Sequence, residues 1–543
     1  MSIRVIFVCA VAAWSVACSA NEQGLGVGSG GGGTGGTIEI DGGGGNGGMI
    51  DTDGSAGGSW VGDPKTCSHA ASAHTYVGCD FWPTVLPNIV GEHFDFAVVV
   101  ANAGEIAAHV KIERGGQVIS EGDVPAESAG KFFLPWVNET KHYSGMCDTD
   151  PSPGFKESSR TPDGAYHLTT SVPVTVFQFN PLEYDPKGGP EGKDWSSCKC
   201  MFGCHSYTND ASLLLPSTSL TGNYFVTGYS GIESPDQNMP GYFSVIGLES
   251  DTNVTMKLGQ NATMVAGGGL PAGGPGDVVE FVIGRGEVVE ILGTQSTDLS
   301  GTQVHADKPV QVMSGHPCIQ LPFDRQACDH LEETVLPAET LGMHYVVARP
   351  TGPGGSAVEQ IVRLFGNADG TQLTYPGNAP PGAPSVLNAG DVVDLGVLDL
   401  DFEVLGDKPF AVTTFQVGNT IVDPTLKGRG DPSQSNVATV EQHRTKYVFL
   451  APDDYDVSFA DVVMPMDAQV RLDGEPLAAS PEAISGGFGV ARAKLGPGVD
   501  GAHLLTSDKP VGLQVMGYGF ATSYQYPGGL DLKGIAPAPP PIK

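Results

Sequence analysis

One short element occurs three times in this 543-residue chain: Ala306-Asp-Lys-Pro-Val-Gln-Val312, Gly406-Asp-Lys-Pro-Phe-Ala-Val412 and Ser507-Asp-Lys-Pro-Val-Gly-Leu513. In each copy Asp-Lys-Pro predicts a turn, and the proline stands at the start of the next strand, where its missing N–H group is tolerated. The residues that follow alternate in character, as expected for a strand with one face on a core. A degenerate fourth copy is Thr170-Ser-Val-Pro-Val-Thr-Val176. The chain therefore carries a repeated β unit.

A second marker precedes each of the three copies: Asn223-Tyr-Phe-Val226, His344-Tyr-Val-Val347 and Lys446-Tyr-Val-Phe449. Pro409 follows Tyr345 by 64 positions, and Pro510 follows Tyr447 by 63. Short runs with strand chemistry, broken by Gly, Pro, Asn and Asp, fill Tyr76 to Tyr526. This pattern predicts an all-β fold of tandem β-sandwich-like domains after a disordered, glycine-rich linker.

The Asp-Lys-Pro residues are interpreted as turn chemistry. They are Asp307, Lys308, Pro309, Asp407, Lys408, Pro409, Asp508, Lys509 and Pro510. A ligand site built from the three turns is the alternative, and no other feature of the sequence supports it.

Composition and the repeats together predict seven segments. They are a signal peptide with a lipobox (1–18), a glycine-rich disordered tether (19–62), a first β unit with a cysteine-rich loop (63–205), a second (206–335), a third (336–435) and a fourth β unit (436–530), and a proline-rich tail (531–543). With 40% apolar residues the chain is too apolar for a disordered protein. Its net charge of −33 argues against proteins that track nucleic acid or dock electrostatically on anionic lipid.

The N-terminus has the features of an export signal. Arg4 precedes an apolar run that is too short to span a bilayer, and small residues follow it. Ser15-Val16-Ala17-Cys18 resembles the bacterial lipobox, with Ser15 where leucine is usual, and predicts lipidation of Cys18. Ordinary signal cleavage near Ala17 or Ala20, releasing a secreted protein, is the alternative. In residues 24–58, 18 of the 35 residues are Gly, which is typical of a flexible tether.

Eight cysteines remain after export, and an oxidising compartment favours disulfides among them. The candidates are Cys67, Cys79, Cys147, Cys198, Cys200, Cys204, Cys318 and Cys328. Proximity favours Cys318–Cys328 first and Cys67–Cys79 second, and a bridge from Cys147 to the Cys198–Cys204 cluster would pin the long loop of Lys141 to Arg160. Zinc at that cluster is the alternative, but its C-x-C-x3-C-H spacing is not a common zinc pattern. No metal and no cofactor is predicted.

Catalytic motifs were not found: the chain has no G-x-S-x-G elbow, H-E-x-x-H sequence or Walker loop. Two pairs of adjacent carboxylates are Glu332-Glu333 and Asp453-Asp454. Neighbours on a strand face opposite sides, so neither pair would flank one bond as glycosidase carboxylates must, and both are interpreted as solvated turns. Trp82, Trp136 and Trp195 are candidate contact residues in loops, with burial in a core or a loop plug as the alternative for each.

Several segments resemble the IgGFc-binding protein N-terminal domain family in its bacterial, myxobacterial-type lipoprotein branch. They are Gly78-Cys-Asp-Phe-Trp-Pro-Thr84, Phe94-Asp-Phe-Ala-Val-Val-Val-Ala-Asn102, Val176-Phe-Gln-Phe-Asn-Pro-Leu-Glu-Tyr184, Asn209-Asp-Ala-Ser-Leu-Leu-Leu-Pro-Ser-Thr218 and Thr221-Gly-Asn-Tyr224. The resemblance implies a surface-exposed, non-enzymatic binding module.

We therefore expect a lipid-anchored adhesion protein at the bacterial outer membrane or cell surface that binds a protein or glycan ligand. IgG Fc binding is implied by the resemblance only. The membrane would be reached through the lipid alone, nucleic acid is not an expected partner, and the sequence gives no oligomeric state. A hydrolase acting on envelope polysaccharide and a structural surface-layer component are the alternatives.

Overall fold

The computed structural model describes residues 64–142, 154–198, 203–234, 237–325, 328–423, 425, 427–532 and 534–542. The described residues form one compact unit. The predicted signal peptide, Cys18 and the predicted tether lie outside the described residues. None of the helices in the described ranges is long and apolar enough to cross a membrane.

Strands are the dominant secondary structure of the described chain, and the all-β prediction is confirmed. The helical segments are short: α1 (Cys67–Ala73), α2 (Asn138–Lys141), α3 (Asn419–Val422), η1 (Ser217–Ser219), η2 (Ala338–Thr340) and η3 (Val440–Gln442). Thr66 caps the N-terminus of α1, where its side chain accepts the amide of His69. His74 caps the C-terminus in the left-handed conformation.

The first repeat consists of two sheets that share one long strand, β7 (His167–Phe179). The N-terminal half of β7 pairs with β1 and β3, and β3 pairs with β4, which makes the outer sheet. The C-terminal half pairs with β2 and β8, and β2 pairs with β5, which makes the inner sheet. The bounds are β1 (Gly78–Phe81), β2 (Phe96–Asn102), β3 (Ala108–Arg114), β4 (Gln117–Val124), β5 (Ser128–Leu134) and β8 (Ala211–Leu214).

The second repeat has the same topology, with the long strand divided at its Asp-Lys-Pro turn. Its outer sheet has the order β9 (Asn223–Phe225), β16 (Gln303–Ala306), β13 (Thr252–Lys257) and β14 (Val278–Ile283). Its inner sheet has the order β18 (Asp329–Thr334), β17 (Val310–Ile319), β12 (Tyr242–Gly247) and β15 (Val288–Leu292). The short strands β6 (Ser159–Thr161), β10 (Ile232–Ser234) and β11 (Gln237–Met239) lie outside this pattern, and β6 extends the inner sheet beside β15.

The third and fourth repeats complete the set. The outer sheet of the third has the order β19 (His344–Val347), β24 (Phe402–Gly406), β21 (Thr371–Thr374) and β22 (Val386–Leu387). Its inner sheet has the order β26 (Gln434–Asn436), β25 (Phe410–Gln416), β20 (Gln360–Gly366) and β23 (Val392–Leu398). In the fourth, the two halves of β33 (Ala502–Gly519) again join both sheets. Its other strands are β27 (Arg444–Leu450), β28 (Val457–Pro465), β29 (Val470–Leu472), β30 (Glu475–Pro476), β31 (Glu482–Ser485), β32 (Phe488–Lys494) and β34 (Thr522–Pro527).

The repeated tyrosine joins the start of each later repeat to its Asp-Lys-Pro turn. In each case the buried hydroxyl donates to the carbonyl of the residue after Asp-Lys-Pro: Tyr224 to Val310 (2.6 Å), Tyr345 to Phe410 (2.6 Å) and Tyr447 to Val511. The same hydroxyls accept the amides of Thr221, Gly342 and Arg444, three positions before each tyrosine. Two polar groups of the backbone are thus satisfied inside each core by one side chain.

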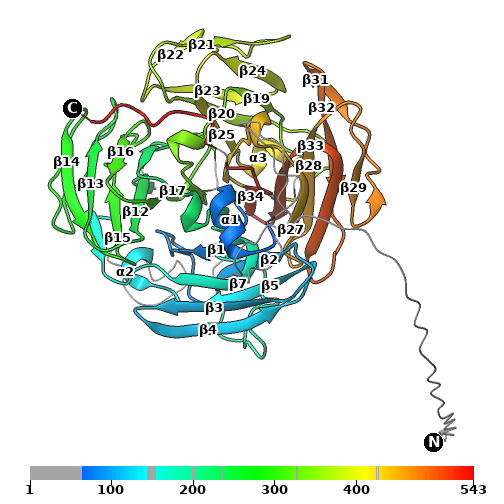
Figure 1. The fold of residues 1–543 in the computed structure, drawn as a ribbon, viewed down its shortest axis with the longest axis horizontal. Coiled ribbons are helices and arrows are strands. Elements are labelled where there is room, and N and C mark those ends of the chain that lie inside the picture. Colours follow the sequence, from blue (N-terminus) through cyan, green and yellow to red (C-terminus); the bar gives the residue numbers. More distant parts are fainter. Residues whose placement is uncertain are drawn as a thin grey trace, which may run out of the picture. The chain divides into compact units, whose positions relative to one another are not determined.

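Four strands, one from each inner sheet, contact one another at the centre of the compact unit: β8, β18, β26 and β34. Figure 1 shows β34 near the middle of the view. The second and third repeats each have an apolar core of their own. The first and fourth share one apolar cluster, in which the rings of Phe177 and Tyr526 lie 4.7 Å apart. The four repeats therefore close into a ring around one axis, an arrangement that the tandem order alone did not predict.

The pairing of β8 bears on the predicted boundary between residues 205 and 206. β8 follows this boundary in the sequence but hydrogen-bonds to β7 of the first repeat, where Val176 faces Leu214. The other predicted boundaries remain predictions.

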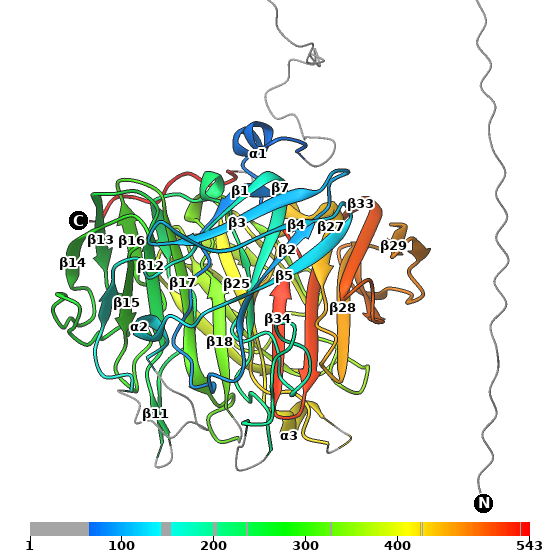
Figure 2. The ribbon, with the colours of Figure 1, turned by 90° about the horizontal axis from the view of Figure 1, so that it is seen from below.

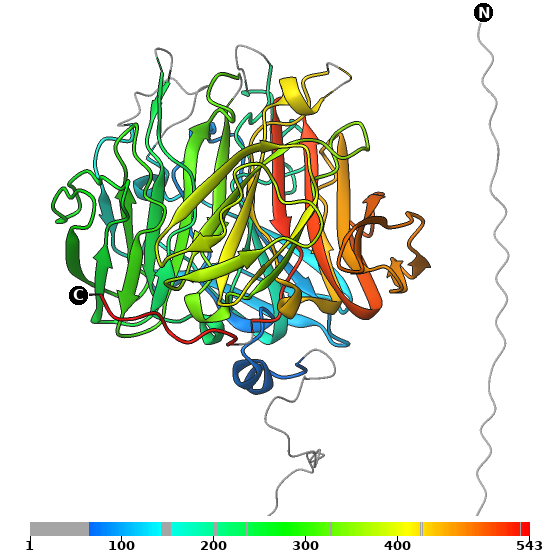
Figure 3. The same cartoon turned by 90° about the horizontal axis from the view of Figure 1, so that it is seen from above.

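The two ends of the ring differ (Figures 2 and 3). The described chain enters at Pro64, beside α1, and α3 lies at the opposite end. The predicted proline-rich tail crosses the α1 end (Figure 3), where the amides of Ile535 and Ala536 donate to the carbonyl of Glu339. Further along the tail, the carbonyl of Pro540 accepts a hydrogen bond from Nε2 of Gln303, which belongs to the second repeat.

Candidate binding face

Each central strand is preceded by a connection at the end of the ring opposite α1 (Figure 2). We call the described residues of these four connections the axial loops: 180–198 with 203–210, 320–325 with 328, 417–423 with 425 and 427–433, and 520–521. Because all four surround one axis, they bring segments far apart in the sequence onto a single surface. Loops that a β scaffold gathers in this way are common sites of recognition.

Disulfides and hydrogen bonds hold the axial loops. Cys198–Cys204 closes a small ring within the first loop, and Cys318–Cys328 spans the second. The third loop is held by Asp423, whose carboxylate accepts the amides of Thr425 and Arg429. Burial raises the pKa of Asp423 and these hydrogen bonds lower it, with a net pKa of about 2.

The six described cysteines form three disulfides. Cys318–Cys328 and Cys67–Cys79 are the two pairings that sequence proximity favours, and Cys67–Cys79 joins α1 to β1. Cys198–Cys204 pairs two members of the predicted cluster. Cys147 and Cys200 lie outside the described residues. Within the described ranges no group of three or more His, Cys, Asp or Glu side chains is arranged to hold a metal ion.

An aromatic cluster, Tyr184, His205, Tyr207 and Phe520, joins the first and fourth axial loops. The His205 ring lies 5.7 Å from that of Tyr184 and 5.9 Å from that of Phe520. Phe520 remains 41% exposed at the tip of the turn between β33 and β34. The amide of Ala521 donates to the carbonyl of Gly428, which fixes this turn against the third axial loop. An exposed ring on a rigid turn is a suitable anchor for a protein partner.

The second axial loop carries another exposed ring, that of Phe323, which is 45% exposed and packs against Tyr229. The tryptophans predicted as contact residues are less accessible. Trp82 is buried, the indole of Trp136 donates to the carbonyl of Phe94, and Trp195 lies half-buried in the first axial loop.

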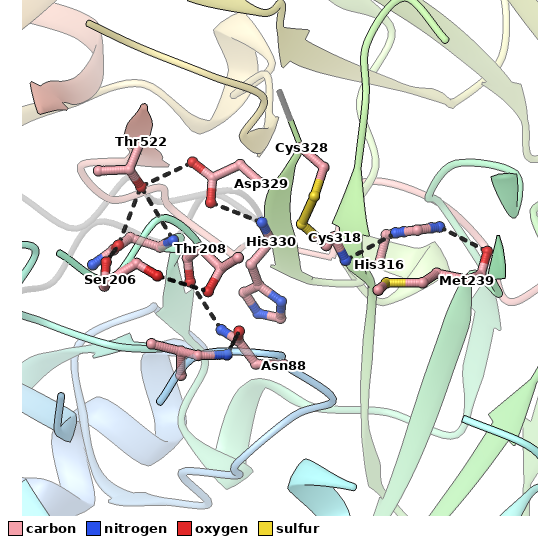
Figure 4. The surroundings of a disulfide bond; sticks show 12 residues. Asn88, Ser206, Thr208, Met239, His316, Cys318, Cys328, Asp329, His330 and Thr522 are labelled. Atoms are coloured by element: carbon pink, nitrogen blue, oxygen red, sulfur yellow. Dashed lines mark hydrogen bonds between the residues drawn. A yellow bond between two sulfur atoms is a disulfide. The ribbon is translucent and has the colours of Figure 1, made fainter. Parts of the chain in front are cut away.

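A buried polar network connects the axial loops to the strands that they join (Figure 4). Asp329 accepts the amides of His330 (2.8 Å) and Ser523 (3.0 Å) and the hydroxyl of Thr522 (2.9 Å). Asn88 Nδ2 donates to the carbonyl of Thr208 at 3.0 Å. These bonds tie the second repeat to the fourth and the start of the first repeat to its axial loop.

The centre of the axis is occupied by the carboxylate of Asp210. It accepts four backbone amides, one from each central strand: Ala211 (2.9 Å), Glu332 (3.1 Å), Gln434 (2.9 Å) and Gln525 (3.3 Å). Each central strand is the last strand of its inner sheet, so its amides on the axial side need acceptors other than a neighbouring strand. Burial raises the pKa of Asp210 well above its usual range, and the amide bonds oppose this rise.

The interpretation of Glu332-Glu333 as a solvated turn is wrong. Both residues lie on β18 and are buried on the axis. Glu333 accepts the amides of Thr334 and Asn436, each at 3.0 Å. Glu332 accepts Asn180 Nδ2 at 3.2 Å and the hydroxyl of Ser212 at 3.2 Å. The physical reason is that these carboxylates satisfy donors of the converging strands, a demand that the local sequence does not reveal.

A cleft of about 240 Å³ lies where the first and fourth repeats meet. Lys131, Glu183, Lys187, Asp453 and Asp454 supply its charged groups. Asp453 is exposed, as predicted for both members of the pair, but Asp454 is half-buried and accepts a backbone amide of the first repeat. Burial raises the pKa of Glu183 to about 8 and that of Asp454 to about 7.

The two carboxylates with raised pKa values each hold a neighbouring loop. Glu183 Oε2 accepts the amide of Asp95 at 3.0 Å, and Asp454 Oδ2 accepts the amide of Tyr184 at 2.9 Å. Lys193 Nζ lies 3.4 Å from Glu183 Oε1. The cleft is therefore a charged junction between repeats, with its carboxylates already bound by the protein.

Comparison with known proteins gives two matches. The family model described as IgGFc binding protein matches residues 210–517, more than half of the chain. A human protein named IgGFc-binding protein is 28% identical over 345 residues, which cover 61% of this chain and 6% of the human protein. The chain thus matches only a small part of that relative's length. No solved structure matches it.

Proposed function

The chain belongs to the IgGFc-binding protein family, and from this premise we propose that it is a non-enzymatic binding protein whose axial loops recognise a protein ligand. The exposed ring of Phe520, held among loops of three repeats, is the observation that carries the proposal. IgG Fc is the first ligand to test, because the human relative is named for it.

The position of the chain entry supports this choice of face. The described chain enters beside α1, and the axial loops lie at the other end of the ring (Figure 2). A tether attached at the α1 end would leave the axial loops accessible to a ligand. We propose that Cys18 is lipidated and that the protein is held at a bacterial outer membrane or cell surface. Replacing Cys18 by Ala should then move the protein from the membrane fraction to the soluble fraction, and unchanged membrane association would contradict the lipid anchor.

The binding proposal is tested with immobilised IgG Fc. We expect the wild-type protein to bind and Phe520→Ala to raise the Kd at least about tenfold, because a buried aromatic anchor contributes 2 kcal/mol or more at an interface. Val282→Ala is the matched control, since Val282 is 49% exposed on β14 in an outer sheet. An equal loss in both variants would reject the axial loops as the binding face. Mucin and envelope glycans in the same assay separate a glycan ligand from a protein ligand.

The alternative function is hydrolysis of an envelope polysaccharide. The cleft between the first and fourth repeats is the place to look for it, because it contains carboxylates. A glycosidase needs two carboxylates free to face one glycosidic bond. Glu183 and Asp454 are instead bound to the amides of Asp95 and Tyr184. We therefore propose binding without turnover, and release of reducing sugars by the purified protein would contradict it.

A further inference from the structure

The lysine of each Asp-Lys-Pro turn bridges two parts of its own repeat. Its ammonium group reaches the turn between the second and third strands: Lys308 binds the carbonyl of Asp251 (3.2 Å), Lys408 that of Asp369 (2.6 Å) and Lys509 the side chain of Asp467. The preceding aspartate binds the third strand, as Asp407 Oδ1 accepts the amide of Gln372 at 2.7 Å. The lysine side chain thus fills the space between two turns in three of the four repeats.

The first repeat keeps the hydrogen bond that the turn aspartate makes to the third strand, but it lacks the lysine. Ser171 replaces the aspartate, and its hydroxyl accepts the amide of His109 at 2.9 Å, the bond that Asp407 makes in the third repeat. Val172 stands where the other repeats have lysine. A valine is too short to reach the turn at residues 103–107, so the space between the two turns is not bridged from within this repeat.

A cavity of about 380 Å³ occupies this position. Its walls include Val172 and Pro173 from the degenerate turn and Ala103 and Ile106 from the facing turn, with Val77 beside them. Most of its lining is apolar, and its volume is within the range of small-ligand sites. The other three repeats hold a lysine side chain in the corresponding place.

Two lysines border this pocket in a chain that has only 28 basic residues and a net charge of −33. Lys446 comes from the fourth repeat, and its Nζ donates to the carbonyl of Ala103 at 2.8 Å. An ammonium group has three protons to donate, and within the described ranges the Lys446 ammonium makes one hydrogen bond, to Ala103. Lys65 lies at the exposed rim, 3.2 Å from Glu105. The pocket therefore combines apolar walls with an excess of positive charge.

We propose that this pocket binds a small apolar molecule that carries a carboxylate, with the acid group on Lys446 and the hydrocarbon against Val172 and Ile106. Burial of the hydrocarbon supplies affinity, and the charge-assisted hydrogen bond selects an anion over a neutral or cationic head group. The site lies at the α1 end and is separate from the axial loops, so it is independent of the binding function proposed above.

The test uses titration calorimetry on the purified protein with octanoate, 1-octanol and octylamine, which share one hydrocarbon chain. Octanoate should bind about tenfold or more tightly than octanol, and octylamine more weakly than either. Val172→Lys should abolish octanoate binding, because the introduced side chain crosses the cavity to the facing turn as in the other repeats. Val172→Met places an uncharged side chain of similar length in the cavity and should abolish binding as well. Lys446→Met should weaken octanoate binding about tenfold and leave octanol binding nearly unchanged.

Val397→Lys is the matched control, since Val397 is 41% exposed on β23 and the substitution adds the same side chain elsewhere. It should bind octanoate as the wild type does. The proposal is overturned if octanol binds as tightly as octanoate, if Val172→Lys still binds octanoate, or if the wild type binds none of the three probes.

Discussion

At the scale of single residues, Asp210 joins all four repeats, because each central strand donates one amide to its carboxylate. Asp210→Asn should destabilise the fold by about 3–5 kcal/mol, since an amide NH₂ replaces one acceptor oxygen and leaves buried donors unsatisfied. The midpoint of unfolding in guanidinium chloride measures the effect.

Asp500→Asn is the matched control for this prediction. Asp500 is exposed and has φ 53°, a left-handed conformation that asparagine also tolerates. We expect its free energy of unfolding to stay within about 0.5 kcal/mol of the wild type. If Asp210→Asn were as stable as this control, the carboxylate would not be the acceptor that holds the central strands.

Residue burial is also where sequence reasoning fails most clearly. Glu332-Glu333 and Asp453-Asp454 are both adjacent carboxylates, yet the first pair is buried and Asp453 is exposed. Nothing local distinguishes them, because the donors that Glu333 satisfies include the amide of Asn436, about 100 positions away. Phe520 was missed for the same reason: its surroundings come from loops of other repeats.

At the scale of elements, the tyrosine and the Asp-Lys-Pro turn act as a pair. Tyr345→Phe removes a buried hydroxyl that donates to Phe410 and accepts from Gly342. The free energy of unfolding should fall by about 1–3 kcal/mol, because a buried carbonyl and a buried amide lose their partner. Thermal unfolding followed by circular dichroism gives the comparison.

Tyr375→Phe serves as the control within the same repeat. Within the described residues the Tyr375 hydroxyl makes one hydrogen bond, to the carbonyl of Pro384 at 3.0 Å, and its side chain is only half-buried. Its removal should therefore cost less than that of the Tyr345 hydroxyl. Equal losses in the two variants would mean that the repeated tyrosine has no special part in joining the two ends of the repeat.

The success of sequence reasoning at this scale has a physical cause. The tyrosine, the turn aspartate and the proline each satisfy a local geometric requirement, so they recur at matching spacings and reveal the repeat. Cys318–Cys328 is equally local, because its cysteines are 10 positions apart. The first repeat hides this pattern, because Ser171 and Val172 replace two of the three turn residues.

At the scale of the whole molecule, closure of the ring was not predictable from the sequence. The first and fourth repeats meet through Phe177 and Tyr526, and through Lys446 and Ala103, pairs about 350 positions apart. Each of these side chains would also fit an isolated sandwich. The sequence predicts the units because their signals are local, and it does not predict how many of them share one axis.

The junction between the first and fourth repeats should make the stability of the ring depend on pH. Glu183 and Asp454 have folded pKa values of about 8 and about 7, above the ordinary values of 4.5 and 3.8. Between the ordinary and the raised pKa the folded protein binds more protons than the unfolded one, so stability falls as the pH rises. His316 and His443, with pKa values lowered by burial to about 3, act in the opposite direction below pH 6.5.

The window in which the carboxylates dominate is therefore pH 6.5 to 8. There the free energy of unfolding should fall by about 1 kcal/mol per pH unit from Glu183 and by about half as much from Asp454, which loses its proton within the window. Glu183→Gln keeps the shape of the side chain and removes its titration, so its Tm should vary less across this window than that of the wild type. Asp453→Asn, on the exposed neighbour of Asp454, should keep the wild-type dependence. A wild-type Tm that is constant from pH 6.5 to 8 would show that these carboxylates ionise without cost, and that the junction is open to water rather than closed between the repeats.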